Sequence, residues 1–346
     1  MISFEKSNPE EQKIDSTILE NFKKKLKNEH ISGCMVMRHE NIVFEFYKNN
    51  KVEPSLHGIH SCTKSFVSAL VGVCIKNGLI YDVHMPIAEF FGDLVLNQSD
   101  QRKQEITIYH LLTMSAGFDW PEFGEWQFFS PMEYSKDIIN FIIGRELESN
   151  PGEKMNYNSG CSHLLSAIVQ KASGKQASEL ARQYLFKPLG INDTHWYEKQ
   201  KVNLGANGLK LKLLDMLKFG YLFLKEGTLQ GNEIIPKEWV KESTTPRFMT
   251  YPDIGHYGYQ WWISSIHLNE NSEIPFYFAL GLFGQYIIVI PQYDMVVVFT
   301  SENYSDTMKP LHYFREYIAK AVREQVLHIR AGRAVRSRIG PLRGQA

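Results

Sequence analysis

Strand-like segments occupy both ends of this chain, and helix-like segments fill the middle. Near the start, residues 33–38 and 41–47 are typical of two strands joined by a short turn at His39 and Glu40. In the last third, aromatic and β-branched runs separated by turn residues cover 257–264, 276–280, 285–290 and 295–301. Strands at both ends predict one antiparallel sheet built from the two ends of the chain, with the helices inserted between them.

The expected helices begin with residues 63–77, a strongly apolar segment that ends at Gly78. Further helices are expected over 15–28, 108–114, 131–143, 161–172, 177–186, 212–225 and 310–326. The predicted class is α+β, with a single domain over 1–327. Its sheet lobe spans about 1–80 and 205–327, and its helical lobe spans about 81–204. A site for small molecules is expected in the cleft between the lobes.

Composition excludes several classes of function. The 346 residues carry 38 basic and 38 acidic side chains, which argues against nucleic acid or a membrane surface as a partner. The four cysteines have no paired spacing, so neither a disulfide framework nor a metal site is expected. The first twenty residues lack a signal-like apolar run, and no 18-residue apolar stretch occurs. A cytoplasmic location is expected, whereas the oligomeric state cannot be predicted.

The last residues, 328–346, differ from the rest. They contain five arginines and no acid, without hydrophobic periodicity. We expect a basic disordered tail, with translated vector sequence as one source. A nucleic-acid-binding arm is the alternative, although nothing in the body of the chain supports it.

The first candidate for chemistry is the Ser-x-x-Lys pattern of Ser61 and Lys64, which opens the most apolar helix. A serine hydroxyl needs a neighbouring base, and a lysine three residues on lies one helical turn away on the same face. The alternative is an N-capping serine with a surface lysine. A lysine at the start of so apolar a helix favours the functional interpretation.

Two further segments contain candidates. Tyr157, in a Tyr-Asn-Ser element before the helix expected from Cys161, offers a phenol for proton relay; the alternative is a packed tyrosine. Residues 281–285 (Gly-Leu-Phe-Gly-Gln) enter a strand, where the glycines Gly281 and Gly284 let substrate approach the backbone closely and the Gln285 N–H is a candidate oxyanion donor opposite the Ser61 N–H. A plain hairpin turn is the alternative.

In this order and spacing, these elements resemble the serine β-lactamase and penicillin-binding-protein superfamily, over residues 15 to 327. The resemblance is to the class C branch, with its family VIII carboxylesterases, D-amino-acid peptidases and 6-aminohexanoate-dimer hydrolases. It extends to 110–117, to 205–209 before a helix with Asp215, and to 257–262. It implies that fold, an acylated serine at Ser61 with Lys64 as its partner, and Tyr157 as the tyrosine of the Tyr-x-Asn element.

The chain departs from the family pattern at two positions. Ser159 stands where that element usually has asparagine, and a serine has shorter reach and fewer donors. Leu282, in Leu-Phe-Gly, stands where the third box has a lysine or histidine, so the cation that would pair with a substrate carboxylate is absent. Leu282 and Phe283 therefore favour a neutral substrate. The aromatic loop 118–129, which includes Trp120, is expected to line an acyl pocket or to pack in the core.

These observations predict a serine hydrolase that cleaves an ester or a small amide through an acyl-enzyme on Ser61, without a cofactor. An esterase is preferred. A β-lactamase or a peptidase for D-amino acids or oligoamides is one alternative. A non-catalytic, penicillin-binding-like protein is the other.

Overall fold

The computed structural model describes residues 2–122, 129–251, 254–269 and 272–323. Nine strands form one sheet in the order β1-β3-β2-β16-β15-β14-β13-β12-β11. Along that order the strands are Glu5–Lys6, Asn41–Tyr47, Ile31–Arg38, Met295–Ser301, Gln285–Ile290, Ser272–Gly281, Trp262–Asn269, His256–Tyr257 and Phe248–Met249. Every pairing is antiparallel except that of β1 with β3. Because β2 pairs with β16, the prediction of one sheet built from both chain ends is confirmed.

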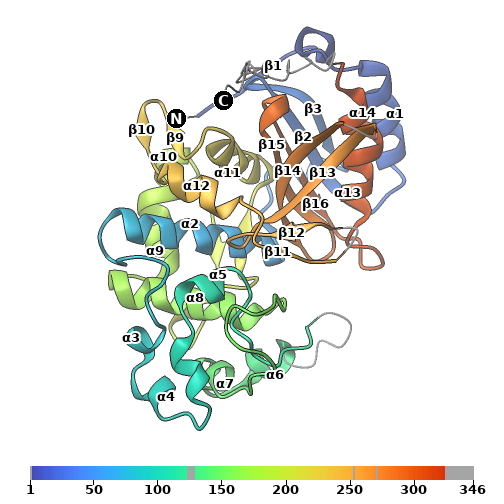
Figure 1. Cartoon of the computed structure of the whole chain (residues 1–346). Coiled ribbons are helices and arrows are strands. Elements are labelled where there is room, and N and C mark those ends of the chain that lie inside the picture. Colours follow the sequence, from blue (N-terminus) through green and yellow to red (C-terminus); the bar gives the residue numbers. More distant parts are fainter. Residues whose placement is uncertain (1, 123–128, 252–253, 270–271, 324–346) are drawn as a thin grey trace, which may run out of the picture.

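Helices cover both faces of this sheet. On one face lie α1 (Ser16–Leu26) and the C-terminal turns α13 (Lys309–Tyr313) and α14 (Ala319–Ala321), as Figure 1 shows. On the other face α11 (Leu213–Leu224) packs against β2, β15 and β16. This helix approaches the sheet closely at Gly220, where an added Cβ would lie 2.6 Å from a methyl carbon of Val296.

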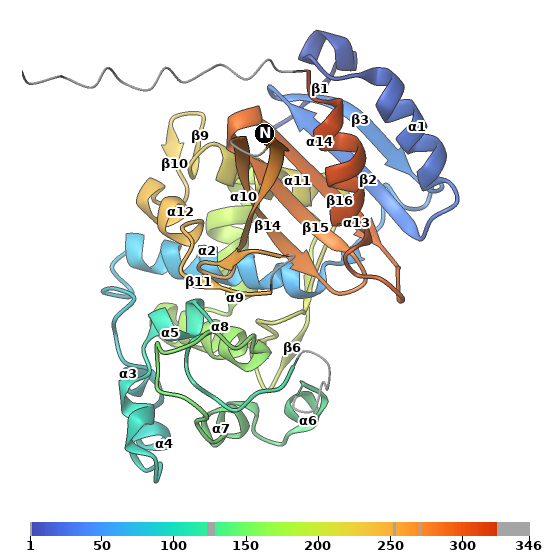
Figure 2. The same cartoon turned by 45° about the vertical axis from the view of Figure 1, so that its right-hand side comes forward.

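A group of helices gathers at one end of the molecule, and α2 (Thr63–Lys76) lies between this group and the sheet (Figures 1 and 2). The group comprises α3 (Ala88–Phe91), α4 (Asp93–Leu96), α5 (Ile108–Leu112), α6 (Phe129–Tyr134), α7 (Ile138–Ile143), α8 (Ser159–Ser173) and α9 (Ala177–Ala181). The helices α10 (Lys187–Leu189) and α12 (Lys237–Ser243) complete the set. Since α2 is buried over Thr63–Cys74, it forms the common core of both parts.

Three predicted elements differ from the structure. The helix expected over 131–143 is two helices, because Asp137 accepts a hydrogen bond from the Asn140 N–H and caps a second start. The strand expected over 257–264 is interrupted at Gly258, where a Cβ would lie 2.3 Å from the Ser243 carbonyl oxygen. The C-terminal helix contains a π-turn over Phe314–Ile318, and its expected end lies outside the described residues.

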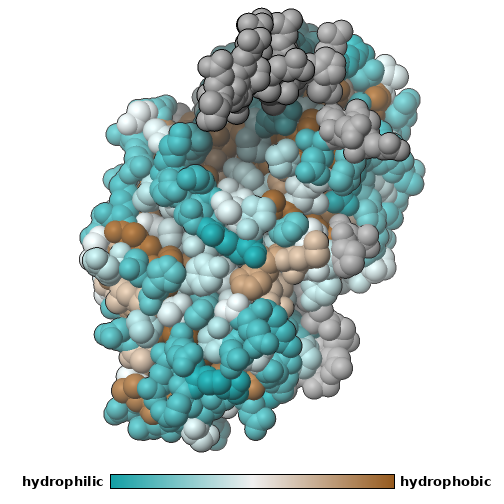
Figure 3. Space-filling view, in the orientation of Figure 1, coloured by the Kyte–Doolittle hydropathy of each residue, from teal (hydrophilic) through white to brown (hydrophobic). Residues whose placement is uncertain are grey.

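The face of the molecule seen in Figure 3 is mostly hydrophilic, and its apolar residues form small separate groups. No helix among the described residues is long and apolar enough to cross a bilayer. The predicted basic tail at 328–346 lies outside the described residues.

Candidate active site

Ser61 lies where the chain enters α2. It belongs to a single 3-10 turn, His60–Cys62, that leads directly into the helix. The helix behind it is buried, whereas Ser61 is half-buried and so retains access to solvent. The positive end of the helix dipole stabilises negative charge that develops on the Ser61 oxygen.

Lys64 brings its amine to that oxygen. Its Nζ lies 3.0 Å from each of three oxygens: Ser61 Oγ, Ser159 Oγ and the backbone oxygen of Ala206. The side chain is only 1% exposed, and burial lowers the pKa of Lys64 to about 8, although the nearby carboxylate of Glu122 opposes this shift. At pH 7 roughly a tenth of the amine is therefore neutral and able to accept a proton.

Tyr157 approaches Ser61 from the segment before α8. Its hydroxyl hydrogen-bonds Ser61, and Lys64 Nζ lies 5.0 Å from its ring centroid. The ring stacks on Trp262, with centroids 5.5 Å apart, and meets Tyr257 edge-on. Burial, and then the negative charge of Glu122, raise the pKa of Tyr157 well above that of a free phenol, so it stays protonated at neutral pH.

Ser159 lies in the first turn of α8, because Asn158 caps the helix two residues earlier than expected. Its Oγ bridges Lys64 Nζ, at 3.0 Å, and Glu122 Oε1, at 2.6 Å. The second oxygen of Glu122 accepts the Ser159 N–H at 2.6 Å. Glu122 is 2% exposed, and sequence analysis missed it. In the sequence, the only indication of its role is that this acidic residue follows Trp120 and Pro121.

The aromatic loop contacts the site through the carboxylate of Glu122. Trp120 is fully buried, and its indole N–H donates to Glu122 at 2.9 Å, so the structure places it at the carboxylate and not against a substrate. Phe118 is also buried. The predicted acyl pocket cannot be traced further, since residues 123–128 lie outside the described residues.

The hairpin after β14 contacts the turn that carries the nucleophile through Gly281, the first of the two glycines of the predicted segment. An added Cβ on Gly281 would lie 2.3 Å from the Ile59 carbonyl oxygen, whereas Gly284 faces Pro310 and Ser301. The close approach to the nucleophile's turn is therefore made by Gly281. Relative to that glycine, the position of the third-box cation is Ala279, so neither alignment supplies a lysine or a histidine.

The side chain of Gln285 does not point toward Ser61. It is the ladder partner of Gly281, and its amide group bonds Thr300 and the backbone of Ser301. In the described part of the chain, neither the Ser61 N–H nor the Leu282 N–H donates a hydrogen bond. Leu282 directly follows the close contact of Gly281 with Ile59, so its N–H is better placed than that of Gln285.

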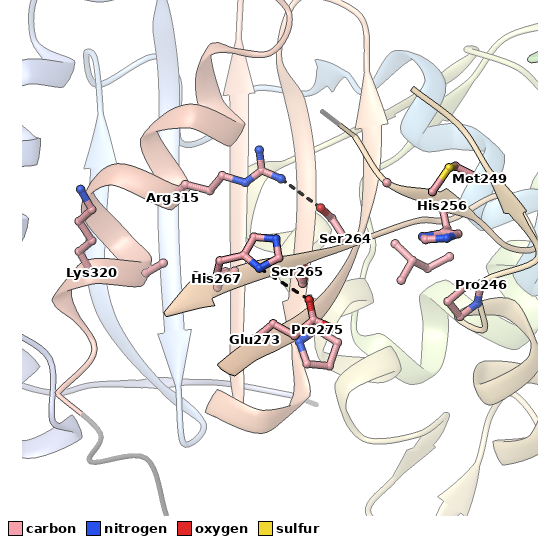
Figure 4. A pocket seen from close by; sticks show the side chains of 14 residues that line it. Pro246, Met249, His256, Ser264, Ser265, His267, Glu273, Pro275, Arg315 and Lys320 are labelled. Carbon is pink, nitrogen blue, oxygen red and sulfur yellow. Dashed lines mark hydrogen bonds and ion pairs between the residues drawn. The ribbon is translucent and has the colours of Figure 1, made fainter. Parts of the chain in front are cut away.

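A separate hollow of about 910 Å³ lies beside β13 and shares no residue with this site (Figure 4). Arg315 donates to Ser264 there at 3.0 Å, and His267 faces Glu273 at 3.8 Å. None of the predicted site residues lines this hollow.

Comparison with known proteins settles the family. The family model described as Beta-lactamase matches residues 21–319. The chain belongs to the Beta-lactamase family. The resemblance inferred from Ser61, Lys64 and Tyr157 is thereby confirmed at the level of the family.

Relatives in this family differ in their named activities. A 6-aminohexanoate-dimer hydrolase of Paenarthrobacter ureafaciens is 22% identical over 312 residues, which cover 82% of this chain and 75% of that protein. The Bacillus anthracis structure solved as "Putative 6-aminohexanoate-dimer hydrolase" has a TM-score of 0.72 at 22% identity and covers 86% of this chain and 81% of that one. The hydrolase EstCE1 has a TM-score of 0.69 at 14% identity, with coverages of 89% and 98%. These structural likenesses show the fold of a family whose members are hydrolases.

Proposed function

We propose that this chain hydrolyses a neutral ester or small amide by two-step acyl transfer through Ser61. One observation carries the proposal: a buried amine whose pKa is lowered to about 8 lies 3.0 Å from a half-buried serine oxygen. That arrangement activates a hydroxyl that would otherwise be a poor nucleophile.

In the first step Ser61 Oγ attacks the carbonyl carbon while Lys64 takes its proton. The resulting oxyanion is held by the N–H groups of Ser61 and Leu282. When the tetrahedral intermediate collapses, the bond to the leaving group breaks. Tyr157, protonated because its pKa is raised, gives its proton to the leaving oxygen or nitrogen and recovers one from Lys64.

In the second step a water molecule takes the place of the leaving group. It attacks the acyl carbon, and Tyr157 takes its proton while giving its own proton to the neutral Lys64 amine. The bond from the acyl carbon to Ser61 Oγ then breaks, Lys64 returns the proton to that oxygen, and the acid is released. In both steps Ser159 and Glu122 position the Lys64 amine, because the Ser159 hydroxyl accepts a hydrogen bond from Lys64 and donates one to Glu122.

The lack of a lysine or histidine at the third-box position supports a neutral substrate. An anionic group such as the carboxylate of a penicillin would lose a charge-assisted hydrogen bond where the family has lysine or histidine. In the alignment on Gly281 this position is the buried Ala279, and in the other it is Leu282, which with Phe283 is half-buried and presents apolar surface. An ester is preferred, and the oligoamide activity named for the Paenarthrobacter relative is the second candidate.

Labelling with an alkyl phosphonate probe, followed by intact-mass measurement, tests the nucleophile. Wild type is expected to gain one adduct, and Ser61→Ala none, with unchanged circular dichroism. Turnover of p-nitrophenyl esters beside a chromogenic cephalosporin and a linear oligoamide then separates the substrate classes. An unlabelled wild type without turnover on any of them contradicts the proposal and favours a binding protein.

A further inference from the structure

Two residues next to the nucleophile hold disfavoured backbone conformations. His60 has a φ of 46° and Phe283 a φ of 65°, in the left-handed region that residues with a Cβ avoid. They come from segments more than two hundred residues apart in the sequence. Such conformations persist where surrounding structure fixes them, and they gather at functional sites.

Their side chains meet. The imidazole of His60 contacts the ring of Phe283 edge to face, with centroids 5.2 Å apart and planes at 89°. Phe283 in turn packs on Tyr304 at 4.5 Å, and Tyr304 is 75% exposed. The three rings therefore form a continuous aromatic ladder, His60–Phe283–Tyr304, that leads from the residue before Ser61 out to solvent.

The backbone around Phe283 is fixed from both sides. Its N–H donates to Thr307 Oγ1 at 3.2 Å, and its carbonyl accepts the Asn303 N–H at 3.1 Å. The ring is therefore held in place without a substrate. A flat group that is already ordered binds a ligand at a smaller entropic cost than a mobile side chain does.

The ladder also lies within reach of the reacting carbonyl. His60 precedes Ser61, and Phe283 follows Leu282, so each ring neighbours one of the two proposed oxyanion donors. The imidazole is electrically neutral at pH 7, because burial, and then the positive charge of Lys64, lower the pKa of His60. The ladder thus offers uncharged ring surface.

We propose that the aromatic ladder His60–Phe283–Tyr304 is a specificity site that binds an aromatic ring of the substrate next to its scissile carbonyl. The inference rests on the proposed function and adds the substrate class: aryl or arylalkyl esters and amides. Aromatic pairs are favoured beyond their buried area, which corresponds to a preference of about two- to tenfold over a saturated ring of the same size.

Matched esters test this inference. Hydrolysis is measured by pH-stat for benzyl acetate against cyclohexylmethyl acetate, and for ethyl phenylacetate against ethyl cyclohexylacetate. In wild type, kcat/KM is expected to be about two- to tenfold higher for the aromatic member of at least one pair. In Phe283→Leu the preference is expected to vanish through a higher KM for the aromatic ester, and Phe283→Tyr is expected to restore it.

Tyr304→Ala is expected to weaken the preference, while Tyr81→Ala serves as its control. Tyr81 is 85% exposed and lies beyond the far end of α2, about 20 Å along the helix from Ser61. Equal rates for both members of each pair in wild type, or an unchanged preference in Phe283→Leu, overturn the inference while leaving the hydrolase intact. Wild type inactive on all four esters, together with no phosphonate adduct, contradicts the proposed function itself.

Discussion

Glu122 binds Ser159 twice, through the N–H and the hydroxyl, each at 2.6 Å. The usual family element has an asparagine where Ser159 stands, and the shorter serine here contacts Lys64 at 3.0 Å while its hydroxyl donates to a buried carboxylate. The negative charge of Glu122 also raises the pKa of Lys64 against the effect of burial. Glu122 is therefore a positioning residue, since it acts through Ser159 and Lys64.

Glu122→Gln is expected to lower kcat about ten- to a hundredfold, the range that corresponds to weakened hydrogen bonds to a charged group. Removing the carboxylate is also expected to lower the pKa of Lys64 further, so the rising limb of the pH–rate profile moves to lower pH. Glu148→Gln is the control, since its partly exposed carboxylate contacts Lys154 and Asn156 and none of the site residues in the described part of the chain. If the rate falls but the rising limb of the pH–rate profile does not move, Glu122 has only a structural role.

The pH dependence of wild type follows from Lys64. Because the neutral amine is the active form and burial lowers its pKa to about 8, activity is expected to rise tenfold per pH unit below 8 and to level off above it. The measurement is kcat/KM for a neutral ester between pH 5.5 and 9.5. A profile that is flat from pH 6 to 9 is incompatible with Lys64 as the base.

Gly281→Ala probes the hairpin. A Cβ there would lie 2.3 Å from the Ile59 carbonyl oxygen, so the backbone must shift and carry the Leu282 N–H with it. A misplacement of about 1 Å at a reacting centre costs about a hundredfold in rate. Gly58→Ala is the matched control nearby, since its Cβ meets only the His60 ring, at 3.8 Å. Full activity in Gly281→Ala argues against the Leu282 N–H as an oxyanion donor.

His163 is expected to make the protein sensitive to acid. It is 2% exposed in α8, and burial lowers its pKa to about 4 from 6.5. The unfolded chain therefore binds a proton first as pH falls below 6.5, so the free energy of unfolding decreases, by about 2 kcal/mol between pH 7 and 5. Urea titrations of wild type and His163→Gln at both pH values measure this loss. The exposed His267→Gln is the control, and an equal loss in all three proteins contradicts the assignment.

Much of the fold could be predicted from sequence. The bounds of β3, β15 and β16 agree with the expected strands, because each is a short β-branched or aromatic run between turn residues. The start of α2 and the pairing of Ser61 with Lys64 follow from helical spacing alone. Asp137 shows the limit, since a capping residue just before an apolar run divides one expected helix into two.

The candidate site was less accessible to sequence. Ser61, Lys64 and Tyr157 lie in recognisable patterns, whereas Glu122 has no periodic neighbour and acts only through its tertiary partners. The contact of Gly281 with Ile59 joins segments more than two hundred residues apart, so local sequence could not show which glycine of the hairpin makes it. The roles of Glu122 and Gly281 depend on contacts with residues that are distant in the sequence.

The pairing of β2 with β16 has a consequence for how the molecule is made. The ladder joins Ile31 to Ser301, so the first strands leave the ribosome about 270 residues before their central partner exists. At ordinary rates of translation this interval is roughly 14 to 54 seconds. Throughout it the apolar β2–β3 hairpin has an unpaired edge of the kind that promotes aggregation, and a chain truncated before Met295 is expected to lack the strand that pairs with β2.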